Sequence, residues 1–253
     1  MSTRAGTRTA RVRSRDQLSE HLIRLVLDLE GFESTGIADE WVGLVVPGQF
    51  QSRYYTVRAF DAVSLTIDIV VHDHGLVTEW AAGDVVGQTV TITDPKGSYA
   101  ASAEADWILL VGDLTAFPAM ARIAESVTQP VRIWAEASEI PLSYFPETAQ
   151  VTHVPLGSQS RLSAVVEELD WPAGAGYFWM AGESAQMRAI RKFLMHDRAM
   201  PTSAYDVMGY WRQVKGRQPR AVDPGPIWRE GKRQGLSDEQ IWDQYDQQRE
   251  AAE

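Results

Sequence analysis

A short stretch in the first quarter of the chain carries residue types that can hold a phosphorylated ligand with a flat ring. Arg53, Tyr55 and Thr56 form an R-x-Y-T pattern, with Tyr54 as the variable residue. In an extended strand alternate side chains point to opposite faces, so Arg53 and Tyr55 share one face. A cation and a phenol placed together can bind a phosphate and a ring face, while Thr56 can reach the ring edge. The pattern would suit a flavin dinucleotide, but taken alone it is better explained by a plain strand with an exposed arginine and two half-buried tyrosines, because short motifs match by chance.

A second candidate site follows the next strand pattern, where His72 precedes a short expected helix over residues 76–82. The first N–H groups of a helix and its dipole favour a pyrophosphate. The residues expected to contact the ligand here are Val70, His72, Gly75, Val77 and Thr78. His72 and His74 also fit a solvent-exposed strand end, or a metal site for which no third ligand is apparent. We therefore expect a pyrophosphate contact here and no bound metal.

The second half of the chain places further candidates at strand ends. An α/β sheet binds nucleotides at the carboxyl ends of its strands. The spacing is not G-x-G-x-x-G, so the Rossmann fingerprint is absent. The candidates at these ends are Asp113, Thr115, Gly182, Glu183, Tyr210 and Trp211. Gly182 permits close backbone approach by a dinucleotide, and the two aromatic residues can cover a ring, although they also fit packing at a strand end. Asp113 and Thr115 also fit an ordinary helix cap.

Three cations complete the set of candidates. Arg58 follows Thr56 by two residues and is expected near the reactive ring. Arg188 and Lys192 lie four residues apart, so they share one face of an expected helix and can bind an anion. The alternative is a solvated basic face.

The elements that must position these residues change character along the chain. Short alternating or apolar runs separated by Gly and Pro turns predict an antiparallel β-barrel over roughly the first 100 residues. From residue 106, apolar runs alternate with helix patterns, which predicts βαβ units and a parallel sheet. We predict an α+β protein with a barrel domain at 1–103, a parallel α/β domain at 104–213 and a C-terminal extension at 214–253. Ser237 and Gln240 form a capping box that opens a helix in this extension.

The composition excludes several functions. The net charge is −10 and the pI is near 5.0, which argues against nucleic acid as a partner. The chain has no cysteine, so it cannot form disulfides, use thiolate catalysis or supply ligands for an iron–sulfur cluster. We expect no membrane insertion, because no apolar run approaches ~20 residues. We also expect a cytoplasmic protein and a monomer. The arginines near the N-terminus fit the wet face of a strand, or less simply a transit peptide.

Taken together, the motifs resemble the siderophore-interacting protein family of FAD-dependent ferric-siderophore reductases, which belongs to the ferredoxin-reductase superfamily. The resemblance extends from about residue 10 to residue 211 and rests on four segments in the family's order. They are residues 53–58, 72–81, 112–119 with the family's G-D-x-T-A-x-P-A motif, and 181–183 together with 209–212. Asp73 stands where the family usually has glycine, and Leu76 and Val77 replace Pro-Ala. Backbone amides do the binding, so these changes need not remove the site.

The resemblance implies an FAD cofactor, NADH or NADPH as the electron donor and a ferric siderophore as the acceptor. It implies that Thr56, Asp113 and Thr115 place the reacting rings, and that Arg58, Arg188 and Lys192 attract an anionic chelate. Reduction would release the iron, because siderophore oxygens hold Fe(II) far more weakly than Fe(III). Two alternatives remain open: a flavin reductase whose acceptor is a partner protein or free flavin, and a nonenzymatic siderophore-binding protein.

Overall fold

The computed structural model describes residues 6–72, 75–212, 230, 233–234 and 236. The chain divides into two units, residues 1–212 and 213–253. In the second unit, the Gln234 N–H donates to the Glu230 carbonyl four residues earlier, as in a helical turn. The helix predicted from Ser237, the predicted boundary at 213/214 and the residues Asp73 and His74 lie outside the described residues.

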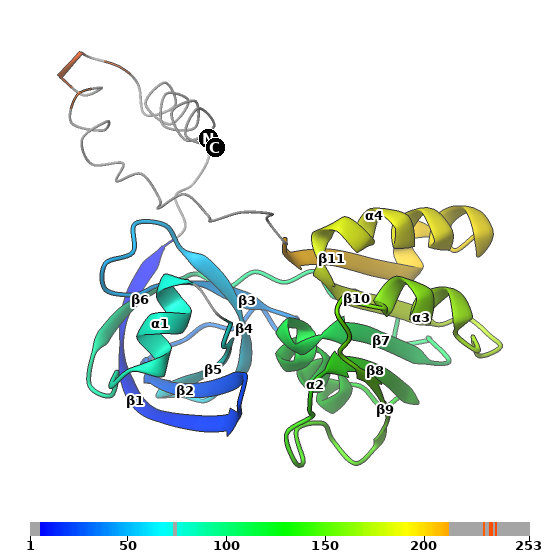
Figure 1. Ribbon diagram of the computed structural model, residues 1–253, viewed down its shortest axis with the longest axis horizontal. Helices are drawn as coiled ribbons and strands as arrows, with labels where there is room; N and C mark the ends of the chain where they lie inside the picture. Colours follow the sequence, from blue (N-terminus) through cyan, green and yellow to red (C-terminus); the bar gives the residue numbers. More distant parts are fainter. Residues whose placement is uncertain (1–5, 73–74, 213–229, 231–232, 235, 237–253) are drawn as a thin grey trace. The chain divides into compact units, whose positions relative to one another are not determined.

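The first part of the larger unit is a closed antiparallel barrel with strand order β1-β2-β5-β4-β3-β6 (Figure 1). The strands are β1 (Thr7–Ser19), β2 (Leu22–Asp28), β3 (Trp41–Val45), β4 (Arg53–Phe60), β5 (Ser64–Val70) and β6 (Thr89–Thr93), and helix α1 (Leu76–Ala82) precedes β6. Alternate residues of β2 and β5 face inward and pair across the ladder, as Leu25 does with Ile67. Both side chains are fully buried, so the two-residue period of the sequence builds the barrel core.

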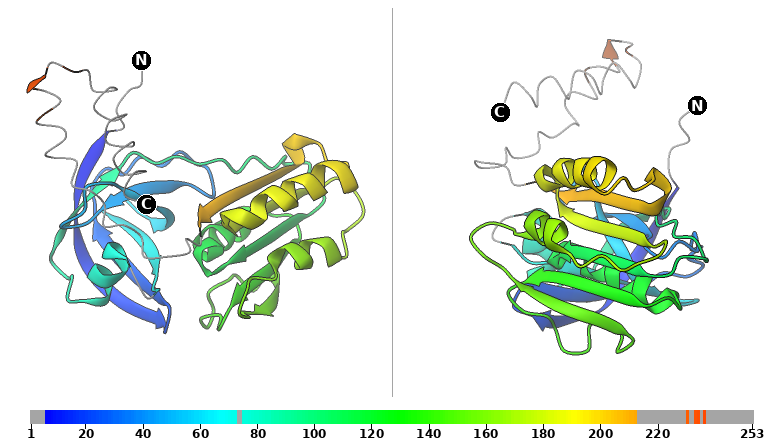
Figure 2. Two further views of the ribbon diagram at one scale, coloured as in Figure 1. Left: turned by 45° about the horizontal axis from the view of Figure 1, so that its top comes forward. Right: turned by 90° about the vertical axis from the view of Figure 1, so that its right-hand side faces the viewer.

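The second part is a parallel five-stranded sheet with order β11-β10-β7-β8-β9. Its strands are β7 (Ile108–Asp113), β8 (Val131–Ala137), β9 (Ala149–Pro155), β10 (Tyr177–Glu183) and β11 (Tyr205–Trp211). Figure 2 shows helices on both faces of this sheet. Ile108 and Leu110 pack with helix α2 (Phe117–Ser126), whereas Leu109 and Val111 pack with α3 (Leu162–Glu168) and α4 (Ser184–Lys192). Burial on both faces explains the continuous apolar runs of these strands.

The barrel and the sheet meet through buried carboxylates on the barrel side. Asp39 accepts hydrogen bonds from the backbone of Ser98 and Tyr99 at 2.9 Å each, and from Trp179 Nε1 at 3.3 Å. Glu40 accepts from Arg122 of α2 at 2.8 Å. Asp68 likewise accepts from the Tyr144 hydroxyl at 2.5 Å and from Arg24 at 2.8 Å. Each buried charge is thus satisfied by donors, as a low-dielectric interface requires.

The predicted architecture is confirmed, with two local differences. The apolar pattern predicts a strand over residues 50–57, but strand β4 begins at Arg53, because a turn at Val46–Gln49 (with the Gln49 N–H bonded to the Val46 carbonyl) is followed by bends at residues 50–51. The pattern also predicts a helix over residues 185–198, but the chain is α-helical only to Lys192 and continues as a π-helix over Phe193–Asp197. The bond from the Arg198 N–H to the Phe193 carbonyl belongs to this wider turn.

Candidate functional site

Strand β4 presents its R-x-Y-T residues at the barrel surface. Arg53 is exposed, and the Tyr54 side chain is 64% exposed. Tyr55 packs against the barrel core, and burial raises the pKa of its hydroxyl to about 12, an effect that the nearby Arg53 charge partly offsets. The strand therefore offers an arginine and an open tyrosine face to a ligand, and Tyr55 supports them from beneath.

The residues predicted around α1 lie together. Gly75 has φ +142, and a Cβ there would meet the His72 ring at 2.9 Å, so only glycine allows this close packing. Thr78 donates to the Val70 carbonyl at 3.3 Å, while Val77 is buried in the barrel core. Among the residues that the structure describes, no side chain caps the first N–H groups of helix α1, whose N-cap residue is Gly75.

Thr56 connects the barrel to the last strand of the sheet. Its side chain is buried and lies close to the Tyr210 hydroxyl on β11. Burial raises the pKa of Tyr210 strongly, with Thr56 opposing it. The Tyr210 hydroxyl is buried and makes no hydrogen bond of normal geometry to any residue that the structure describes. Thr56 and Tyr210 were both predicted as site residues and are 154 positions apart in the sequence. They meet where the barrel joins the sheet.

Asp113, at the end of β7, is the centre of the most connected cluster. Its Oδ1 accepts from the Thr115 N–H at 2.9 Å and the Thr115 hydroxyl at 2.5 Å. Its Oδ2 accepts from Trp211 Nε1 at 2.7 Å. The side chain is buried, and this burial raises the pKa of the carboxyl, an effect that the donors from Thr115 and Trp211 partly offset. The helix cap that the sequence allowed as an alternative is present, since Asp113 accepts from the Thr115 N–H, whereas the predicted role of Asp113 and Thr115 at the nicotinamide stays a prediction.

Gly182 and Glu183 end the neighbouring strand β10. A Cβ on Gly182 would lie 2.7 Å from Asp113 Oδ2, and its φ of +158 also disfavours other residues. Glu183 is buried and accepts from the Ala185 N–H, so it caps α4. Glycine is therefore required here by the carboxylate of Asp113, a reason that the sequence did not reveal.

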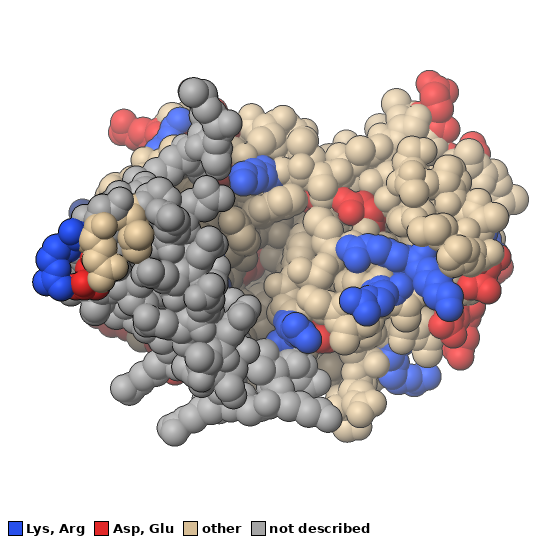
Figure 3. All heavy atoms as spheres, turned by 90° about the horizontal axis from the view of Figure 1, so that it is seen from above, with Lys and Arg blue, Asp and Glu red and all other residues tan. Residues whose placement is uncertain are grey.

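The three predicted cations differ in their surroundings. The Arg58 guanidinium donates to both carboxylate oxygens of Glu125 on α2, at 2.8 and 2.6 Å, and lies over the Tyr144 ring. Arg188 and Lys192 are exposed on α4 and form no ion pair with any residue in the described part of the chain. Figure 3 shows lysine and arginine side chains gathered on the face that includes α4. Arg58 is thus neutralised within the fold, and α4 carries the free positive charge.

Sequence reasoning missed two acids near these groups. Glu125 pairs with Arg58, as described above. Glu136 ends β8 beside Asp113 in the parallel register, is 1% exposed, and leaves Oε2 without a hydrogen bond to the described residues. Its negative charge raises the pKa of Asp113. Glu136 could have been found from the sequence, because it stands near the end of an apolar strand run, as Asp113 does.

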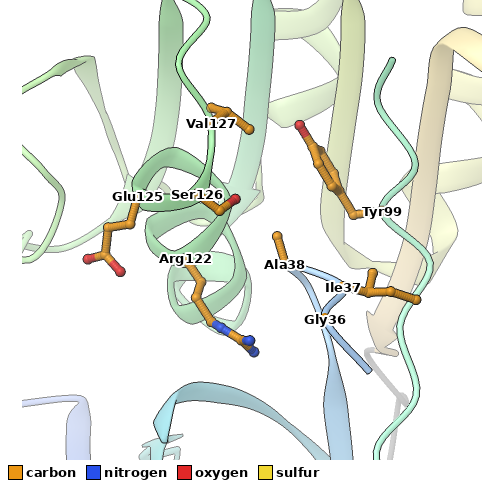
Figure 4. A pocket seen from close by; sticks show the side chains of 8 residues that line it. All are labelled: Gly36, Ile37, Ala38, Tyr99, Arg122, Glu125, Ser126 and Val127. Atoms are coloured by element: carbon orange, nitrogen blue, oxygen red, sulfur yellow. The ribbon is translucent and has the colours of Figure 1, made fainter. Parts of the chain in front are cut away.

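A pocket of about 420 Å³ lies apart from these residues. It is lined by the loop Gly36, Ile37 and Ala38, by Tyr99, and by the end of α2 at Arg122, Glu125, Ser126 and Val127 (Figure 4). None of the residues predicted from the sequence lines it, and its two charged side chains are paired with Glu40 and Arg58. We therefore place the candidate site on the surface groups of β4 and α1 and on the strand ends of the sheet.

The antiparallel barrel followed by a parallel sheet is a ferredoxin-reductase-like fold. The chain resembles a ferredoxin reductase in carbazole 1,9a-dioxygenase with a TM-score of 0.66 at 14% identity, covering 83% of this chain and 71% of that one. Residues 48–99 match the siderophore-interacting FAD-binding domain, and residues 105–214 match the siderophore-interacting protein family. The two models together cover more than half of the chain, which belongs to the siderophore-interacting protein family.

Two relatives are similar over much of their length. A siderophore utilization protein from T. fusca has a TM-score of 0.71 at 28% identity, covering 83% of this chain and 94% of that one. Ferric vibriobactin reductase ViuB of Vibrio cholerae is 29% identical over 179 residues, which are 66% of each chain. Among the described residues, no helix is long and apolar enough to cross a bilayer, and no group of three or more His, Asp or Glu side chains is arranged to bind a metal.

The residues present fit an FAD. Large apolar side chains are exposed on the R-x-Y-T strand, just before it and at the start of α1, namely Tyr54, Phe50 and Leu76. Exposed side chains of this kind can contact the flat ring of a ligand. The Tyr210 hydroxyl is buried next to Thr56 and makes no hydrogen bond of normal geometry to the described residues, so it is a further polar group that a bound ligand can satisfy. Arg53 supplies the cation that a pyrophosphate needs.

Proposed function

We propose that this chain is an FAD-dependent reductase that transfers electrons from NADH or NADPH to a ferric siderophore and releases Fe(II). One observation carries the proposal. Thr56 of the flavin-type strand lies against Tyr210 of β11, so the barrel surface joins the carboxyl edge of the sheet, where Asp113 and Trp211 lie. A flavin on the first and a nucleotide on the second would meet at this junction. The similarity to ferric vibriobactin reductase supports the choice of acceptor.

The chain's own residues bind and orient in this proposal, and none acts as a nucleophile. Arg53 holds the pyrophosphate, Tyr54 covers a ring face, and Thr56 lies at the ring edge. Val70, His72, Gly75, Val77 and Thr78 shape the phosphate end of the site at α1. When bound, FAD would supply hydride uptake from the nicotinamide and single-electron transfer to Fe(III). One hydride carries two electrons, so each donor reduces two ferric chelates and a proton is released.

The chelate is expected to approach from the free positive charge on α4. Arg188 and Lys192 are exposed and unpaired within the described residues, in a chain whose net charge is −10. A local cation cluster offsets the repulsion of an anionic chelate by such a chain. Arg58 contributes only after its ion pair with Glu125 opens.

The test begins with the purified full chain. We expect a yellow protein that holds about one FAD, which acid extraction and chromatography distinguish from FMN. Anaerobic NADH or NADPH should bleach the flavin, and a ferric siderophore should restore its colour while a ferrous chelator such as ferrozine reports Fe(II). Absence of any flavin would favour the nonenzymatic binding protein, and a flavin reduced normally but indifferent to ferric chelates would favour another acceptor. Either result would overturn the proposal.

A further inference from the structure

The connection between Asp113 and Trp211 has features that a helix cap does not require. The cap uses only Oδ1, which accepts both donors of Thr115. The other oxygen, Oδ2, accepts from the indole N–H of Trp211 at 2.7 Å, across the single strand that separates them. Both carboxylate oxygens therefore have donors before any substrate arrives. The side chain is only 8% exposed, so a nicotinamide has little access to it.

Strand β10 lies between the two partners, and its glycine makes their contact possible. The order β11-β10-β7 places β10 between Trp211 and Asp113. A Cβ at Gly182 would stand 2.7 Å from Asp113 Oδ2, the oxygen that receives the indole. A side chain at this position would displace the carboxylate. The hydrogen bond thus depends on three strand ends that are separate in the sequence.

Trp211 is held at both its backbone and its side chain. Its carbonyl accepts from the Ser184 hydroxyl at 2.7 Å, and its indole N–H is bound by Asp113. Its side chain is nevertheless 41% exposed, which is high for an indole. A large aromatic face that is fixed by a buried acid and left open to solvent is a preorganised surface for a flat ring. The carboxyl edge of an α/β sheet is where a nucleotide substrate binds.

We infer that Asp113 is a positioning residue that acts through Trp211: its carboxylate holds the indole as a stacking surface for the flat ring of the nicotinamide nucleotide. The inference rests on the proposed function, since it concerns the donor of that reaction. It assigns the contact with the donor to Trp211, and it gives Asp113 and Gly182 the task of fixing the indole. Loss of the hydrogen bond should weaken donor binding more than it slows the transfer, because the indole remains but is no longer held.

The kinetic test uses a double-mutant cycle on the FAD-loaded protein. In Trp211→Phe the ring is smaller and the N–H donor is lost. In Asp113→Asn one acceptor oxygen remains, so the side chain can satisfy either Thr115 or Trp211 but not both. Anaerobic stopped-flow reduction with NADH and NADPH yields the donor Kd and the limiting rate. We expect each variant to raise Kd about five- to tenfold with a smaller change in limiting rate, and the double variant to show no further loss.

A matched control and a second readout separate positioning from folding. Trp107→Phe also loses an indole hydrogen bond, to the Ala173 carbonyl at 3.1 Å, but before the start of β7. It should leave the donor Kd unchanged. In spectra of ¹⁵N-labelled protein, the indole N–H resonance that disappears in Trp211→Phe should move upfield in Asp113→Asn, independently of any turnover.

Multiplicative losses in the double variant, an unchanged Kd in Trp211→Phe, or an indole resonance unaffected by Asp113→Asn would each overturn the inference. If neither nicotinamide nucleotide reduces the wild-type flavin, the proposed function fails instead. The donor assay on wild-type protein therefore distinguishes the two failures.

Discussion

Replacing Arg122 by methionine is expected to destabilise the fold by about 3–5 kcal/mol, because it leaves a buried carboxylate without its cation. Arg122 Nη2 lies 2.8 Å from Glu40 Oε1, and its Nη1 donates to the Val57 carbonyl at 2.9 Å. Glu40 is 0% exposed, so water cannot replace the lost partner. The ion pair also connects α2 to the end of β4, the strand that carries R-x-Y-T. Flavin affinity should therefore fall together with stability.

The free energy of unfolding is measured at pH 7 by urea titration, with circular dichroism as the signal. Urea is uncharged, so it does not screen the ion pair. The control Arg13→Met also removes an ion pair, but Arg13 and Asp28 are 44% and 47% exposed. That change should cost less than about 1 kcal/mol. The double variant Arg122→Met/Glu40→Gln should recover much of the loss, because a neutral amide needs no cation. The reasoning would be refuted if Arg122→Met cost no more than Arg13→Met.

The same carboxylate predicts an acid dependence. Burial alone would raise the pKa of Glu40, but hydrogen bonds from Ser34, Thr35 and Arg122 hold it below its ordinary value of 4.5. Because the folded pKa is lowered, Glu40 stabilises the fold fully above pH 4.5, and this contribution disappears as the pH falls through the folded pKa. Wild-type protein should therefore lose stability below pH 4.5 more steeply than Glu40→Gln. Parallel pH profiles of the unfolding free energy would contradict this.

Three further changes test the site. Arg53→Ala should lose about 1–3 kcal/mol of flavin binding, read as the flavin-to-protein absorbance ratio after gel filtration, and full occupancy would make the motif purely structural. Gly182→Ala should lower the melting temperature and cost roughly 1–3 kcal/mol, from strained backbone and displacement of Asp113; a variant as stable as wild type would refute the close contact. Glu125→Gln should free Arg58 and lower KM for an anionic ferric chelate severalfold, an effect that shrinks as salt rises above ~0.15 M. An equal change with a neutral chelate would assign Arg58 to packing.

The layers of the fold were predictable because the side-chain periods are physical consequences of burial. A barrel strand has one wet face, so β2 alternates, whereas β10 is buried on both faces and is continuously apolar. Glycine and proline turns separated the elements, and helix α1 was predicted at its observed bounds, Leu76–Ala82. Local chemistry likewise offered the cap at Asp113 as an alternative to a functional role, since its partner Thr115 is two residues away.

The contacts that give the site its chemistry depend on strand neighbours and could not be predicted from one sequence. Asp113 meets Trp211 only because β10 separates their strands and has glycine at the crossing. Arg58 is neutralised by Glu125 only because α2 packs beside β4. The hydrophobic period and the secondary-structure propensities of a sequence indicate burial and local geometry. They do not indicate which charged residues, distant in the sequence, lie opposite each other in the fold.

The distribution of charge between the barrel and the sheet limits how this fold can be recombined. Asp39, Glu40 and Asp68 belong to the barrel sequence, while donors that satisfy them come from Trp179, Arg122 and Tyr144 in the second part. A chimera that joins this barrel to the α/β part of a relative would keep all three acids and inherit another set of partners. The α/β part can therefore be exchanged between relatives without loss of stability only when Trp179, Arg122 and Tyr144 are kept together with the barrel.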